Sequence, residues 1–187
     1  GDTTPGLDPA HLPGHAPGSL LTPFVYLTAF TRGFNPASLM WDIPTLFSEE
    51  INHTNNPGEK YLGPIRLRQA LANDYLIPTL ATMNQIGAEN IWRTVDQFNI
   101  SWSSQNTAST QNLECPDCQY LWSGGEVTLL EMSQAYGILS NQGNFVGLVN
   151  ANQDNAALDS VTILRVSDTH GEEWLVNQVP DVQPVTS

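Results

Sequence analysis

Basic side chains are scarce in this sequence, because 6 Lys and Arg residues stand against 19 Asp and Glu residues, for a formal net charge of -13. Lys60 is the only lysine, and the five arginines are spread along the chain. So acidic a surface repels phosphate groups, which argues against nucleic acids and anionic membrane surfaces as partners. The longest apolar run, residues 20–30, also falls short of the roughly 20 residues that cross a bilayer. We therefore expect any membrane anchor or export signal to lie outside this chain.

Cysteine is equally scarce, since the sequence holds only Cys115 and Cys118, in a single CxxC motif. A structural zinc site needs four ligands, and the four histidines have no spacing that would complete one, so we expect no metal site. A redox site would place the pair at the start of a helix in a thioredoxin-like unit, which the polar flanks do not favour. A local disulfide and two free thiols on a surface loop both stay open. No cofactor is expected.

The apolar and aromatic content suffices for a sizeable core. The 187 residues are 40% hydrophobic and include 5 Trp, 5 Tyr and 6 Phe, which is typical of one globular domain. Residues 1–18 are rich in Pro and Gly and lack periodicity, which predicts an extended N-terminal segment. Residues 19–176 are expected to form a partial domain, and residues 177–187 an unstructured tail.

Helices are indicated where apolar residues recur every three or four positions. An almost wholly apolar run begins at Ser19 and stops near Gly33, which predicts a buried helix that tolerates Pro23 in its first turn. A second helix should end at Gly87, and a third, shorter one should follow it directly. Their apolar positions are Leu76, Leu80, Met83 and Ile86 in the second helix and Ile91, Val95 and Phe98 in the third.

A fourth helix is predicted to begin at Thr128, because Thr128 and Glu131 have the spacing of a capping box. It should end at residues 141–143, where Asn, Gln and Gly interrupt the helical periodicity. The face expected to be buried comprises Leu129, Met132, Tyr136 and Leu139.

Polar and proline-rich stretches separate these helices. Residues 34–64 predict a long ordered loop with one short strand. Residues 99–123 are rich in Ser, Asn and Gln and form a loop or insertion that carries the CxxC motif. Apolar and polar residues alternate over 161–166, an Asp-Thr-His-Gly turn follows, and residues 172–176 can form a second strand that runs back along the first. This pattern indicates a β-hairpin.

Short motifs follow one another between residues 16 and 176. In chain order they include Pro17-Gly18-Ser19, Pro23-Phe24-Val25-Tyr26, Asn35-Pro36-Ala37-Ser38, Asp42-Ile43-Pro44, Tyr61-Leu62-Gly63-Pro64, Ile77-Pro78, Gly124-Gly125-Glu126-Val127-Thr128, Ala135-Tyr136-Gly137-Ile138 and Asp168-Thr169-His170-Gly171. Their order resembles the transpeptidase domain of class A penicillin-binding proteins, bifunctional enzymes whose serine acyltransferase domain cross-links peptidoglycan. The resemblance implies an α-rich α+β fold, namely the helical part of the penicillin-binding transpeptidase (serine β-lactamase-like) fold with small β-hairpins. It also implies that the family's sheet strands, two before the nucleophile helix and three after the hairpin, are missing here.

The resemblance also locates the family's catalytic positions. Ser19 corresponds to the nucleophile, and Thr22 stands where the Ser-x-x-Lys motif has its lysine. In the Ser-x-Asn motif, Asp74 replaces the serine and Leu76 replaces the asparagine. The Lys-Thr-Gly motif has no counterpart, since Lys60 is followed by Tyr and Leu. Serine acylation needs a base beside the hydroxyl. A threonine cannot accept a proton at neutral pH, which argues against catalysis by this chain.

Each position also has a structural interpretation. Ser19 could serve as a helix N-cap. Asp74 could be favoured near the start of a helix by capping and by the helix dipole. A remaining interpretation makes Asp74 the base for Ser19, although an aspartate carboxylate is a weak base and no histidine is placed to relay the proton.

The resemblance leads to two main hypotheses of function. The first is a catalytically degenerate transpeptidase-like module of a bacterial peptidoglycan-synthesis protein, with a structural or binding role in cell-wall assembly. The alternative is an active D,D-transpeptidase or carboxypeptidase that β-lactams still acylate at Ser19, through an altered general base. An interaction domain with no cell-wall ligand is a third interpretation. The expected location is extracytoplasmic, with the anchoring segment outside this chain. Expected partners are peptidoglycan, cell-wall proteins, or the rest of the parent protein or another chain packed on an exposed helical face.

Overall fold

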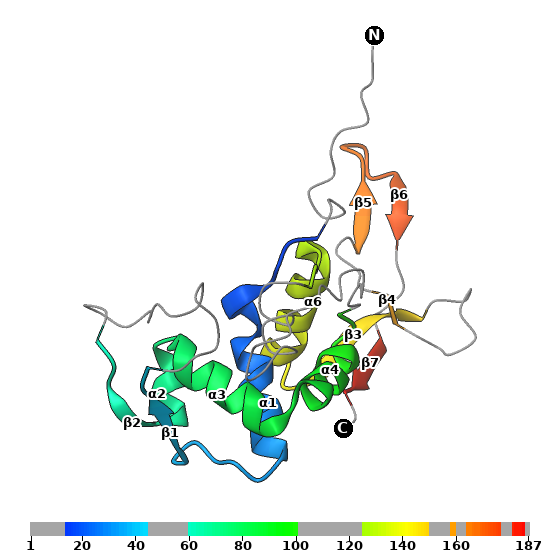
Figure 1. The fold of residues 1–187 in the computed structure, drawn as a ribbon. Coiled ribbons are helices and arrows are strands. Elements are labelled where there is room, and N and C mark those ends of the chain that lie inside the picture. The colour runs from blue at the N-terminus through cyan, green and yellow to red at the C-terminus, as the bar shows by residue number, and fades with distance from the viewer. Residues whose placement is uncertain are drawn as a thin grey trace. The chain divides into compact units, whose positions relative to one another are not determined.

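The structure is a computed structural model that describes residues 14–44, 60–100, 125–149, 158–159, 164–176 and 181–185 (Figure 1). The chain divides into two compact units. The first contains the described residues up to Asp96, together with Ile100 and residues 125–132. The second contains Gln97–Asn99 and the described residues from Ser133 onwards. Helices and short strands together give the α-rich α+β class that the sequence predicts.

The first apolar run forms two consecutive helical segments. Gly18–Leu21 make a 3-10 turn, η1, and Thr22–Thr31 make helix α1. Pro23 lies in the first turn of α1, where the missing N–H removes no intrahelical hydrogen bond. The chain leaves the helix at Arg32, close to the predicted end.

The two helices predicted around Gly87 are confirmed. Helix α3 spans Leu76–Ile86, and α4 spans Ala88–Gln97. Gly87 joins them with a φ of 79°, in a region that glycine adopts more readily than other residues. The predicted apolar positions that are buried are Leu80, Met83, Ile86, Ile91, Val95 and Phe98. None of the helices in the described segments has the length and hydrophobicity that a bilayer crossing requires.

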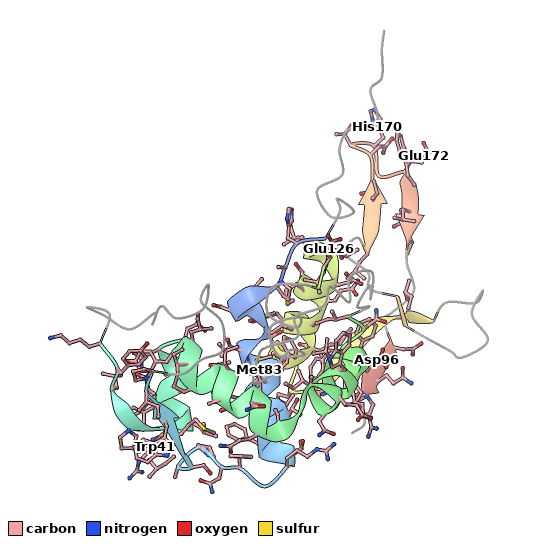
Figure 2. All side chains as sticks on the ribbon, viewed as in Figure 1. Trp41, Met83, Asp96, Glu126, His170 and Glu172 are labelled. Carbon is pink, nitrogen blue, oxygen red and sulfur yellow. The ribbon has the colours of Figure 1, made fainter. Side chains whose placement is uncertain are left out.

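The core of the first unit lies where α1 packs against α3 (Figures 1 and 2). Tyr26 of α1 and Met83 of α3 are both 0% exposed. A short helix that the spacing did not indicate, α2 at Leu67–Ala72, packs against both α1 and α3. Leu67 and Ala70 of α2 are buried with Tyr26 in one apolar cluster.

Two strands form in the region where the sequence predicted one. Strand β1, Leu39–Asp42, pairs antiparallel with β2, Gly63–Arg66, and residues 45–59 lie outside the described part. Met40 and Asp42 are buried, so alternate residues of β1 face the core. The prediction missed β2 because its Gly-Pro start is typical of a turn and its pairing partner is distant in the sequence.

Helix α6, Leu129–Ser140, begins with the predicted capping box. The backbone N–H of Thr128 donates to Glu131 Oε2 at 2.8 Å, and the N–H of Glu131 donates to the Thr128 hydroxyl at 3.2 Å. The predicted buried face is only partly right, because Met132 is buried but Leu129 and Tyr136 are exposed. The residues that are buried in α6 are Met132, Ala135 and Ile138. Apolar residues lie on nearly every side of this helix, so their spacing does not select one face.

The described residues of the second unit form two small sheets. Strand β3, Asn144–Val149, lies between β4, Leu158–Asp159, and β7, Asp181–Pro184. Strand β7 contradicts the expectation that residues 177–187 form an unstructured tail. The prediction missed this strand because it pairs with the distant β3, and such a pairing leaves no pattern in the local sequence.

The predicted β-hairpin is confirmed over its described residues. Strands β5, Arg165–Ser167, and β6, Glu173–Val176, pair antiparallel around the turn. Asp168 Oδ1 accepts hydrogen bonds from the backbone N–H groups of His170 and Glu172, each at 2.8 Å, which fixes the turn. Residues 161–163 of the predicted hairpin lie outside the described part.

Gly14 lies where two backbone segments meet closely. The next residue, His15, exchanges two backbone hydrogen bonds of 3.0 Å with Val127. A β-carbon on Gly14 would stand 2.8 Å from the Glu126 β-carbon and 2.9 Å from the Val127 nitrogen. Since backbone atoms cannot rotate away, a side chain at position 14 would push the two segments apart.

We predict that Gly14→Ala lowers the free energy of unfolding by about 1–3 kcal/mol, the usual range for overpacking. Gly137→Ala is the matched control, because a β-carbon added to Gly137 in α6 would meet no atom within 4 Å other than those of its chain neighbours and its own helix backbone. Alanine should there stabilise the helix by up to about 1 kcal/mol. Urea denaturation followed by circular dichroism measures both variants. Unchanged stability in Gly14→Ala would contradict the prediction.

Candidate functional site

Ser19 lies in the 3-10 turn η1, one turn before α1. Its side chain is exposed, and its backbone carbonyl accepts a hydrogen bond from the N–H of Thr22. Pro17 is the N-cap of η1 and Leu21 that of α1, and neither makes a side-chain capping bond. The interpretation of Ser19 as a helix N-cap is therefore wrong, because the 3-10 turn continues the helical backbone past it.

Thr22 and Asp74 meet in the structure although 52 residues separate them in the sequence. The Thr22 hydroxyl donates a hydrogen bond to Asp74 Oδ1 at 3.1 Å. Thr22 is 2% exposed at the first position of α1, and Asp74 is half-buried in the turn between α2 and α3. The two residues that the resemblance assigns to the lysine of Ser-x-x-Lys and the serine of Ser-x-Asn are thus in direct contact.

Asp74 adopts an unusual backbone conformation. Its φ is 51°, in the left-handed region, where non-glycine residues are disfavoured by about 1–2 kcal/mol and Asp is among the better tolerated. The N–H of Asp74 donates to the Leu71 carbonyl, and the N–H of Tyr75 donates to the Ala70 carbonyl. This pattern is a Schellman motif that closes the C-terminus of α2. Glycine is usual at this position, and the bond to Thr22 gives a physical reason for an aspartate there.

The structure corrects the expected relation of Asp74 to a helix start. The N-cap of α3 is Tyr75, which makes no side-chain capping bond, and the first turn of α3 holds no acidic residue. Asp74 therefore caps the preceding helix through its backbone and binds Thr22 through its side chain.

Leu76 is the first residue of α3 and is half-buried. The resemblance assigns it to the family's asparagine position, where a side-chain amide can donate and accept hydrogen bonds. A leucine side chain has neither group, so it cannot bind a substrate by hydrogen bonds.

The sequence did not indicate a buried hydroxyl pair one turn beyond Thr22. The Tyr26 hydroxyl is hydrogen-bonded to Thr79 Oγ1 at 3.2 Å, and both residues are 0% exposed. Burial raises the pKa of Tyr26 to about 12, hydrogen bonds with Thr79 and Thr82 oppose the rise, and the Asp74 charge adds to it. The four-residue spacing from Thr22 to Tyr26 is the signal that could have placed both on one face of the helix.

Among Thr22, Tyr26 and Leu76, no side chain can accept a proton at neutral pH. Thr22 donates its hydroxyl to Asp74, Tyr26 retains its proton, and Leu76 is apolar. Over the described ranges, no group of three His, Cys, Asp or Glu side chains is placed to hold a metal ion. The CxxC motif lies outside those ranges, so the state of its cysteines stays a prediction.

Comparisons with known proteins identify similar sequences and folds. The family model for the penicillin binding protein transpeptidase domain matches residues 13–173. Penicillin-binding protein 1A of Pseudomonas aeruginosa is 30% identical over 132 residues, which are 68% of this chain and 15% of that protein. The structure of penicillin-binding protein 1A from Haemophilus influenzae matches with a TM-score of 0.63 and 20% identity, over 93% of this chain and 23% of that one. PonA1 from Mycobacterium tuberculosis, in complex with penicillin V, matches with a TM-score of 0.63 and 19% identity, over 94% of this chain and 44% of that one.

The similarity to solved structures confirms the expected transpeptidase fold. The chain spans 15% of the length of the P. aeruginosa relative. Activity and partners of such a whole protein therefore do not transfer to this chain by similarity alone.

Proposed function

We propose, since this chain belongs to the penicillin-binding protein transpeptidase domain family, that it is a catalytically degenerate transpeptidase module with a structural or binding role in cell-wall assembly. The hydrogen bond from Thr22 to Asp74 carries this proposal. Where the family has a lysine to take the serine proton, this chain has a buried hydroxyl that donates to a carboxylate. Ser19 then keeps its proton at neutral pH and is a poor nucleophile.

One observation favours the alternative of an active D,D-transpeptidase or carboxypeptidase. Ser19 is present at the nucleophile position with an exposed side chain. In that case Asp74 would have to serve as the altered general base. Its bond to the Thr22 hydroxyl occupies one oxygen and argues against this role.

The proposal includes an extracytoplasmic location, because peptidoglycan is assembled there, with anchoring by a segment outside this chain. Its partners would be peptidoglycan, cell-wall proteins, or another part of the parent protein. A peptidoglycan pull-down distinguishes this role from an interaction domain with no cell-wall ligand, because only the former should sediment with purified sacculi.

The test of the proposal is acylation. We predict that incubation with a fluorescent penicillin leaves no covalent adduct on Ser19, because the hydroxyl has no base to remove its proton. Denaturing gel electrophoresis and peptide mass spectrometry measure the adduct. An active penicillin-binding protein serves as the positive control, and Ser19→Ala reports labelling elsewhere. A stoichiometric adduct that is lost in Ser19→Ala would establish the alternative.

A further inference from the structure

The outer face of the β1–β2 ribbon is apolar where a solvent-facing sheet surface is usually polar. Leu39 lies opposite Arg66, and Trp41 lies opposite Pro64. Leu39 is 64% exposed and Trp41 is 59% exposed, and both lie on the opposite face of β1 from the buried Met40. Figure 2 shows Trp41 at the ribbon, away from the helices. We call these four residues, Leu39, Trp41, Pro64 and Arg66, the ribbon face.

Further apolar side chains adjoin the ribbon face. Ile43 follows β1 and is 40% exposed, and Leu62 precedes β2 and is 47% exposed. Single exposed apolar residues are ordinary, but a group of them around a tryptophan is typical of an interaction site. Aromatic residues and arginine are also the types most enriched at the energetic centre of protein interfaces.

The charge at the ribbon face is opposite to that of the whole chain. Three arginines have a side-chain partner, namely Arg32 with Asn90, Arg93 with Glu89 and Arg165 with Glu173. Within the described part of the chain, no carboxylate pairs with Arg66 or with Arg68, and both residues are exposed. In a chain with 19 acidic residues, Arg66 lies diagonally across the ribbon from the exposed Trp41 and makes a local site for carboxylates.

We infer that the ribbon face docks a partner protein through a segment in which Asp or Glu stands next to an aliphatic or aromatic side chain. The carboxylate binds the guanidinium of Arg66. Arg68, two residues further along the chain, adds a second positive charge. The apolar side chain packs on Leu39 and Trp41. Diagonal neighbours across an antiparallel pair lie close enough for one short segment to contact both Trp41 and Arg66. This inference is independent of whether Ser19 can be acylated.

The test measures binding of a fluorescent peptide of alternating glutamate and leucine to the full chain by anisotropy. We expect binding that weakens with salt and that falls about tenfold in Trp41→Ala and in Arg66→Glu. Trp174→Ala and Arg93→Glu are matched controls, since Trp174 is 73% exposed and Arg93 is an exposed arginine elsewhere. A peptide of alternating lysine and leucine should not bind.

Several results would overturn the inference. These are equal losses in the variants and their controls, equal binding of the two peptides, or no binding by the parent chain. A concentration-dependent dimer in sedimentation velocity that Trp41→Ala abolishes would instead assign the ribbon face to a second copy of this chain. Melting curves establish that the variants fold. If Trp41→Ala does not fold, Arg66→Glu alone still tests the inference.

Discussion

A chain with both Thr22→Lys and Asp74→Ser should react at Ser19 with a fluorophosphonate probe about 100-fold faster than the parent chain, the lower range for a general base. Thr22→Lys alone should react nearly as slowly as the parent chain. The probe forms a bond from phosphorus to the serine oxygen and releases fluoride. The serine proton must therefore pass to a base. Labelling at Ser19 is followed over time by gel fluorescence and located by mass spectrometry.

The difference between the two variants follows from the contact between positions 22 and 74. An ammonium group introduced at position 22 would lie beside the Asp74 carboxylate, which now accepts the Thr22 hydroxyl at 3.1 Å. An opposite charge at that range holds a lysine in its protonated form, which cannot act as a base. When Asp74 is replaced by serine, burial at position 22 lowers the pKa of the new amine instead, since Thr22 is 2% exposed.

Matched controls separate catalysis from a mere change in packing. Thr22→Met with Asp74→Ser introduces a side chain of similar length that has no amine, and it should react like the parent chain. Adding Ser19→Ala to the reactive double variant should abolish labelling. If Thr22→Lys alone reacts as fast as the double variant, the view that Asp74 prevents a lysine from acting as a base is wrong.

Features set by neighbouring residues could be predicted from the sequence. The capping box of Thr128 and Glu131 and the break at Gly87 both depend on contacts within one helical turn or on one backbone angle. The β5–β6 hairpin likewise depends on its own turn around Asp168. Each of these elements was recognised because its stabilising contacts are local.

Features set by distant residues could not be predicted. Strand β7 forms by pairing with β3, and β2 forms by pairing with β1 across residues 45–59. Neither pairing leaves a periodic pattern in its own segment. The resemblance to the family identified Thr22 and Asp74 as substituted positions, but not the hydrogen bond between them or the left-handed backbone of Asp74. The proposed loss of acylation depends on that bond.

Raising the pH from 10 to 12 should remove about 2 kcal/mol of stability through Tyr26 alone. Burial raises the pKa of Tyr26 to about 12, above its usual value of 10.0. The folded chain therefore holds this proton more tightly than the unfolded chain does. The resulting stabilisation is fully present below pH 10 and is lost as the pH rises through about 12. Urea denaturation midpoints at intervals from pH 8 to 12 measure the loss.

Tyr26→Phe isolates this contribution from the other groups that titrate in the same range, because they respond equally in both chains. The variant should lose about 0.5–1.5 kcal/mol at neutral pH, the usual value of one buried hydrogen bond. Thr79 Oγ1 still donates to the Tyr75 carbonyl at 2.8 Å, so no buried donor is left unsatisfied. Between pH 10 and 12 the variant should lose less stability than the parent chain, and the gap between them should close or reverse. If stability falls equally with pH in Tyr26→Phe and in the parent chain, the phenol ionises as readily in the folded chain as in the unfolded one. That result would contradict the prediction that burial raises the pKa of Tyr26.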